Sequence, residues 1–374
     1  MLNEPNANVE SKKNGVRHYT EDEMKYGWFT IRPGCLQVML KPLLCLLTFV
    51  GCCMTSVVLQ HMLPAVEPTL KRRYKLTDKE VTGLSVTQGI SLIVAVILLG
   101  YFGNFRARKI RCISAGMALS GLGAIFFSIP HYRTEAHKPI PDVPKQHLMM
   151  FGLCRLSQIP CTSENVESPH MALFVLGQIM IGLGVAPLYC LVPAYLDEII
   201  NPKRMPLAML VWFAGLLIGP IIGFVTSSVF LQIYIDIEQP KLLHQMDPQD
   251  MRWHGAWWLG YLVFGVITLF NSLIVSGFPV SLPGSQAIRD EYILKGHIPS
   301  NDDEVTESAS GVLHATTSLL KNKAFAFNTL AIICVLFFLH TLGPFMIPLV
   351  MFKYGADPFK IAMPVMLALV FGLI

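Results

Sequence analysis

The stretch that decides the fold is Asp-Met-Arg-Trp-His-Gly-Ala-Trp-Trp-Leu-Gly, residues 250–260, where a charged segment gives way to a long apolar run. It holds three of the chain's five tryptophans. Tryptophan prefers the boundary between membrane and water, because its ring can be buried there while its N–H stays hydrated. Arg252 adds a permanently charged donor, and two glycines allow a second helix to approach closely. The stretch therefore predicts the start of a membrane-spanning helix.

The rest of the chain has the composition of a membrane protein. Of its 374 residues, 53% are hydrophobic and 14% are charged, whereas a soluble domain carries about 25% charged residues. Seven uncharged runs exceed the roughly 20 residues that a helix needs to cross a membrane, and an eighth begins at Ile361. The seven runs are Pro42–Val66, Val81–Phe105, Cys112–Tyr132, Ser168–Leu196, Met205–Ile235, Gly255–Ile288 and Ala324–Phe352. We therefore predict an all-α polytopic membrane protein with no Asp, Glu, Lys or Arg inside its spans.

Residues 250–261 resemble the signature of the organic anion transporting polypeptides, D-x-R-W-[IV]-G-A-W-W-x-G-[FL], at the start of their sixth span. Two positions differ, because His254 replaces Ile or Val and Tyr261 replaces Phe or Leu. The resemblance implies a major-facilitator fold, whose two related halves hold the substrate between them. It also implies alternating-access transport, without sodium or ATP, of large amphipathic organic anions. Bile salts, steroid conjugates, thyroid hormones and eicosanoids are the substrates implied.

On this resemblance the chain divides into four parts. Residues 1–37 are expected to form a cytoplasmic tail, 38–279 a six-span N-terminal bundle, and 280–323 a cytoplasmic linker. Residues 324–374 would hold span seven and an incomplete span eight, so we expect a C-terminally truncated member that does not transport alone. A short, strongly basic loop after span two favours a cytoplasmic N-terminus. A short outer loop is expected over residues 67–80, and the family implies the plasma membrane.

Residues 100–109, Gly-Tyr-Phe-Gly-Asn-Phe-Arg-Ala-Arg-Lys, resemble the facilitator loop motif G-x-x-x-D-x-x-G-R-[KR]. We interpret this loop as a topology anchor and conformational latch, because its cations can face lipid phosphates or a helix C-terminus. The residues that carry this interpretation are Gly100, Asn104 (in place of the acid), Arg106, Arg108 and Lys109.

Span five contains a second motif, similar to one in facilitator antiporters. Gly215, Gly219 and Gly223 recur every four residues and therefore lie on one helix face, which allows close helix packing. Pro220 leaves a backbone carbonyl without its usual partner and predicts a bend.

Four residues are predicted to bind substrate. Arg252, Trp257 and Trp258 place a cation beside aromatic rings at the outer mouth of span six. Ile-Pro-His-Tyr, residues 129–132, resembles the family's P-H-[FY], whose histidine is associated with pH-dependent uptake. His131 is either an interfacial hydrogen-bonding residue or a titrating group that attracts anions. Thr87–Gly89 lacks the acid that family members often have in span two, which weighs against a histidine–carboxylate site.

Cys154 and Cys161 share the long loop after span three, and we expect them to form an extracellular disulfide. No nucleotide-binding loop, metal-ligand pattern or nucleophile–base arrangement is found, so the sequence predicts neither an enzyme nor a cofactor. The positive charges lie in separate loops, so a net charge of +4 does not indicate a nucleic-acid partner. The expected partners are the organic anion and membrane lipid, and no oligomeric state is predicted. The alternatives are a facilitator for a neutral steroid and a non-transporting membrane scaffold or sterol binder.

Overall fold

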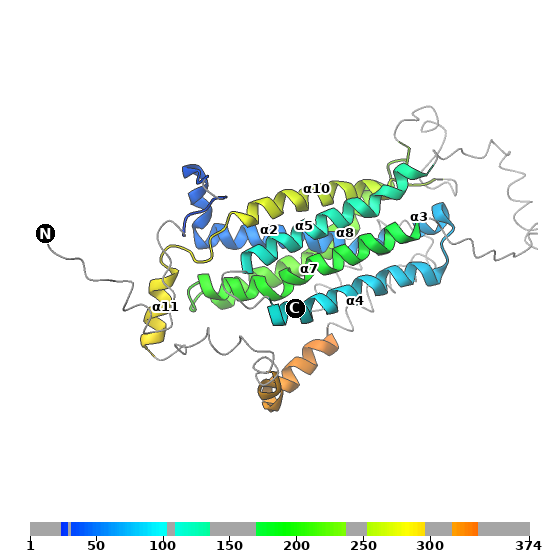
Figure 1. Ribbon diagram of the computed structural model, residues 1–374. Helices are drawn as coiled ribbons and strands as arrows, with labels where there is room; N and C mark the ends of the chain where they lie inside the picture. Colours follow the sequence, from blue (N-terminus) through cyan, green and yellow to red (C-terminus); the bar gives the residue numbers. More distant parts are fainter. Residues whose placement is uncertain are drawn as a thin grey trace, which may run out of the picture.

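The structure, a computed structural model, describes residues 24–28, 31–102, 109–134, 170–236, 253–295 and 316–335. Six helical segments in these ranges are long and apolar enough to cross a membrane, so the chain is an all-α polytopic membrane protein. Figure 1 shows them side by side as one bundle. They are α2 (Pro42–His61) with α3 (Leu63–Tyr74), α4 (Asp78–Phe102), α5 (Lys109–Arg133), α7 (Met171–Ile199), α8 (Met205–Leu231) and α10 (Trp257–Ser276).

The first span is longer than its uncharged run predicts. Met62 links α2 to α3 with helical backbone angles, so the two helices form one segment from Pro42 to Tyr74. Lys75 ends α3 in the left-handed conformation (φ 53°), and α4 begins at Asp78. The expectation of an outer loop over residues 67–80 is therefore wrong, because most of this range is helical.

Charged residues also lie within the spanning segments, contrary to the sequence-based expectation. In the last turns of α3, Lys71 Nζ is 2.5 Å from Glu67 Oε1 and 2.7 Å from Asp78 Oδ1 at the start of α4. The helices extend past the uncharged runs because charged side chains at helix ends can reach the membrane surface.

Glycines bring α8 against α2. A Cβ atom at Gly219 would lie 2.8 Å from Val57 Cγ1, and one at Gly223 would lie 3.0 Å from the Val58 carbonyl oxygen. Gly215 faces Val50 in the same way. These three glycines therefore line the face of α8 that packs on α2, where larger side chains would hold the helices apart. Pro220 lies inside α8, which continues to Leu231.

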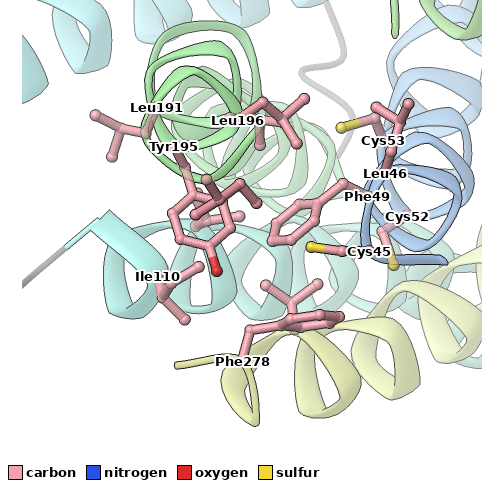
Figure 2. Packing of buried hydrophobic residues seen from close by; sticks show 14 of the residues in the cluster. Cys45, Leu46, Phe49, Cys52, Cys53, Ile110, Leu191, Tyr195, Leu196 and Phe278 are labelled. Atoms are coloured by element: carbon pink, nitrogen blue, oxygen red, sulfur yellow. The ribbon is translucent and has the colours of Figure 1, made fainter. Parts of the chain in front are cut away.

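The two ends of the bundle have separate hydrophobic clusters. One end, here called the tryptophan end, is defined by Tyr74, His131, Phe174, Trp257 and Trp258. The other, here called the lysine end, is defined by Tyr26, Lys109, Tyr195, Glu198 and Phe278. Figure 2 shows part of the second cluster, where Phe49 of α2 lies between Tyr195 of α7 and Phe278, which follows α10.

Two short helices lie at the lysine end. The 3-10 helix η2 (Gly34–Leu40) precedes α2, and α11 (Ser285–Leu294) follows α10. Figure 1 shows α11 lying across this end of the bundle, at an angle to the spans. The uncharged run Gly255–Ile288 thus contains a span that ends at Ser276, a turn region and the start of α11. A shorter apolar helix, Lys323–Val335, lies where span seven was expected.

Candidate functional site

The signature segment ties the end of α8 to the start of α10. The Ile235 N–H donates to the His254 carbonyl (2.9 Å), and the Ala256 N–H donates to the Ile233 carbonyl (2.8 Å). The two backbones run antiparallel here, through a bridge between Tyr234 and Gly255. A side chain at Gly255 would collide with the Leu231 carbonyl, so the crossing requires glycine.

Two tryptophans strengthen this junction with their indole N–H groups. Trp253 Nε1 donates to the Leu231 carbonyl (2.9 Å), and Trp258 Nε1 donates to the Ile235 carbonyl (3.2 Å). Leu231 is the last residue of α8, so its carbonyl has no partner within the helix and the bond from Trp253 satisfies it. The bond from Trp258 holds the segment that follows α8. The tryptophans of the signature therefore have a structural task as well as a position at the membrane boundary.

Trp257 is the central ring of the tryptophan end and is fully buried. It makes edge-to-face contacts with Tyr74 of α3, Phe127 of α5 and Phe174 of α7, at centroid distances of 5.8, 6.0 and 5.7 Å. Aromatic pairs at these distances and angles stabilise beyond the burial of their surface. Trp257 thus holds four spans together and does not offer its ring to a ligand from outside the bundle.

Trp258 and His131 form the second aromatic contact of this end. Their rings are stacked, with centroids 4.4 Å apart and an interplanar angle of 9°. Tyr132 meets Trp258 edge to face at 5.3 Å and is largely exposed, whereas His131 is half-buried. A protonated imidazole in this position would be attracted to the face of the indole. The structure therefore brings together two of the predicted substrate-binding residues.

Two opposite charges lie beside this stack. Burial raises the pKa of the Tyr234 hydroxyl, the negative charge of Asp236 raises it further, and the positive charge of Arg73 lowers it. The same two charges act on His131. Arg73 was not singled out from the sequence, because it falls in the expected outer loop. The signal was present, since Lys71, Arg72 and Arg73 are three consecutive basic residues at the end of a span.

The lysine end holds a buried ion pair. Lys109 Nζ, at the start of α5, lies 2.5 Å from Glu198 Oε1, near the end of α7. The two side chains are only 7% and 14% exposed. Lys109, the last residue of the predicted latch loop, is therefore paired with an acid on another helix. Gly100 of the same loop lies near the end of α4, and Asn104, Arg106 and Arg108 lie outside the described residues. Sequence reasoning missed Glu198, because an acid at the end of an apolar run has no pattern that names its partner.

Residues before η2 also close the lysine end. The Tyr26 hydroxyl donates to the Ile274 carbonyl (2.7 Å), and Trp28 Nε1 donates to the Leu273 carbonyl (2.8 Å). The Gly27 N–H donates to the Gly277 carbonyl (2.9 Å). These bonds satisfy the last carbonyls of α10. Burial raises the pKa of Tyr26 to about 12. The tail expected from the sequence thus ends in a segment that is docked on span six.

Three further predicted residues lie outside the described residues, besides Asn104, Arg106 and Arg108. Arg252 lies outside the described residues, immediately before Trp253. Cys154 and Cys161 also lie outside them, so their disulfide stays a prediction.

Comparison with known proteins identifies the family. Residues 42–372 match the Organic Anion Transporter Polypeptide family. The chain belongs to this family. It is 28% identical over 310 residues to solute carrier organic anion transporter family member 4C1 of Homo sapiens, an alignment that covers 81% of the chain and 42% of the relative. It is 27% identical over 268 residues to member 4A1 of Mus musculus, covering 70% and 35%. Member 1C1 of Homo sapiens is 28% identical over 270 residues, covering 67% and 37%.

The chain spans less than half the length of these relatives, between 35% and 42%. The family assignment therefore rests on the six-span bundle and the residues that follow it.

Proposed function

We propose that this chain forms the first half of a plasma-membrane transporter that moves large amphipathic organic anions by alternating access, independently of sodium. The observation that carries the proposal is the tryptophan end, where Trp258 of the family signature lies against His131, and Arg73 and Asp236 act on that histidine. The names of the relatives support organic anions as the substrate class. Bile salts, steroid conjugates, thyroid hormones and eicosanoids are the proposed members of that class.

We place the tryptophan end outside the cell and the N-terminus in the cytoplasm. The acid group of the substrate would then meet Arg73, His131 and Arg252, while its hydrocarbon body would lie against Trp258 and Tyr132. Tyr132 is 62% exposed, so part of this aromatic surface is accessible from outside the bundle. Cations attract the anion at a distance, and aromatic rings bind its apolar body.

At the lysine end, the proposed role of the loop after α4 is that of a latch. Lys109 is paired with Glu198 between α5 and α7, which joins the start of one span to the end of another. The loop cations Arg106 and Arg108 are proposed to face lipid phosphates.

The test is uptake by cells that express the whole product of the coding sequence. A radiolabelled steroid sulfate is compared with the same steroid without the sulfate, in the presence and absence of sodium. The proposal expects saturable, sodium-independent uptake of the sulfate. Saturable uptake of the unconjugated steroid alone would favour a neutral-steroid facilitator. Binding without uptake of either would favour a scaffold or sterol binder.

A double variant, Arg252→Ala with Trp258→Ala, tests the tryptophan end directly. We expect it to reach the cell surface and to lose most of the uptake of the steroid sulfate, because it removes a cation and the stacked ring. Normal uptake at a normal surface level would show that this end does not bind the substrate.

A further inference from the structure

A polar pair lies deep inside the apolar bundle, between α2 and α7. The Tyr189 hydroxyl donates a hydrogen bond to Gln60 Oε1 at 2.7 Å, and both side chains are half-buried. Gln60 is 18 residues from Pro42 and 14 from Tyr74 along the first span. At a rise of 1.5 Å per residue, these separations are about 27 Å and 21 Å. The pair therefore lies inside the bundle, away from both ends of this helical segment.

The amide of Gln60 has hydrogen-bonding capacity that the bundle does not use. Its oxygen accepts from Tyr189, and its two N–H donors have no acceptor among the residues that the structure describes. If the amide oxygen and nitrogen of Gln60 were exchanged, one N–H group would donate to the Tyr189 oxygen. The other N–H group and the Tyr189 hydroxyl would then be left without an acceptor. The pair keeps an unused donor in both arrangements.

A donor of this kind is costly against lipid, because hydrocarbon offers no acceptor. Polar groups inside a membrane accordingly face either the interior of a bundle or a water-filled path. The half-buried state of Gln60 shows that the six described spans do not cover it completely. In facilitators the substrate binds near the middle of the membrane, where the two halves meet. The Gln60 amide is such a donor, and it lies on a side of α2 that the described spans do not cover completely. This position is suitable for a residue on the substrate pathway.

We propose that Gln60, oriented by Tyr189, binds the acid group of the organic anion in the middle of the membrane and distinguishes conjugated from unconjugated substrates. The inference rests on the proposed transport function and adds a specificity-determining residue to it. Two amide N–H groups match the oxygens of a carboxylate or sulfate. Because the amide is neutral, it can receive a negative group without leaving a fixed cation in the membrane when the site is empty.

The test measures the KM for a steroid sulfate and for the same steroid without the sulfate. In Gln60→Leu, we expect the KM for the sulfate to rise about tenfold or more, since hydrogen bonds to charged groups are lost. The KM for the unconjugated steroid should stay the same wherever the parent takes it up. In Tyr189→Phe the amide remains but is no longer oriented, so a smaller rise, roughly threefold, is expected.

Ser272→Ala is the matched control. Ser272 Oγ donates to the Ser114 carbonyl at 2.8 Å, so this variant also removes a hydrogen bond between two spans. The Ser272 side chain is buried, and we expect no change in either KM. Surface biotinylation gives the amount of each variant in the membrane, and the two KM values do not depend on that amount.

The outcomes separate the site from the transport function. A parent without saturable uptake of the steroid sulfate would remove the proposed function, and this inference with it. A parent that transports, with an unchanged KM for the sulfate in Gln60→Leu, would overturn only the role of Gln60. If Gln60→Leu does not reach the surface, Tyr189→Phe decides, because an unchanged KM ratio in that variant also overturns the inference.

Discussion

The two ends of the bundle are closed by different interactions. At the lysine end, an ion pair joins Lys109 to Glu198, and Tyr26 and Trp28 donate to successive carbonyls at the end of α10. At the tryptophan end, Trp257 is surrounded by rings from three other helices, and Trp258 is stacked on His131. The lysine end thus contains a buried ion pair, whereas rings from several helices fill the tryptophan end.

This difference indicates how the two ends respond to charge. The charges of the ion pair at the lysine end already neutralise one another and are removed from water, so a ligand gains little there. At the tryptophan end, a titratable ring lies beside one cation and one anion, and an anionic ligand can change that balance. We infer that the lysine end fixes the helices and that the tryptophan end is where charge is recognised. Each prediction below tests one side of this contrast.

The largest effect is expected for Lys109→Met. The variant removes the cation of a buried ion pair, and loss of one partner costs about 3–5 kcal/mol of stability in comparable buried pairs. Thermal unfolding of the purified protein in detergent measures the loss. The exchange Lys109→Glu with Glu198→Lys should recover part of it, because the pair is restored with its direction reversed.

The control for this variant is Lys295→Met, at the residue that follows α11. Lys295 pairs with Glu291 of α11, but the two side chains are 57% and 59% exposed. We expect no measurable change, because water replaces the partner of an exposed charge. Equal unfolding temperatures for Lys109→Met and the parent would show that the lysine end is not held by its ion pair.

A smaller loss is expected for Trp257→Leu at the opposite end. The substitution keeps an apolar side chain but removes the ring that contacts Tyr74, Phe127 and Phe174, and it leaves a cavity. Replacing a buried ring in this way costs about 2–3 kcal/mol. The unfolding temperature should therefore fall less than in Lys109→Met. A fall larger than in Lys109→Met would reverse the ranking of the two ends.

The contrast also shows what a sequence can and cannot predict here. The six spans follow from apolar runs, because each helix satisfies its own backbone hydrogen bonds and needs only sufficient length. The helix ends do not follow, since Glu67 and Lys71 continue α3 beyond the uncharged run. Trp258 and His131 could be selected as interfacial residues, but their stacking depends on how α5 and α10 pack. Glu198 and Gln60 were missed because the role of each depends on a partner that lies 89 or 129 residues away in the sequence.

Tyr26→Phe should have a modest effect on stability alone. It removes the hydroxyl that donates to the Ile274 carbonyl and keeps the ring, so the expected loss is about 1 kcal/mol. The KM for the steroid sulfate should not change, because the lysine end is proposed to fix the helices without binding substrate. Thermal unfolding is measured on the purified protein in detergent, and uptake is measured in cells that express the same variant. Tyr132→Phe serves as the control for stability, since its hydroxyl bonds to none of the described residues. A changed KM in Tyr26→Phe would contradict the division of roles between the two ends.

The smallest effect is expected from His131→Gln, as a change in pH dependence. Protonation of His131 adds a positive charge to that of Arg73 and offsets Asp236. The Tyr132 ring contacts the imidazole, and the same two charges act on Tyr234. Uptake of the steroid sulfate by the parent should therefore rise, by about two- to threefold, as the external pH falls from about 7.5 to 5.5.

In His131→Gln the amide keeps a polar group of similar size but does not titrate, so uptake should no longer respond to pH. His254→Val is the matched control, because His254 also lies at the tryptophan end and valine is a residue of the family signature. It should keep the pH response of the parent. A response that survives in His131→Gln, or is lost in His254→Val, would assign the proton to another group. If the response survives in both variants, the lysine end would have to be considered again, because neither His131 nor His254 would carry the charge change.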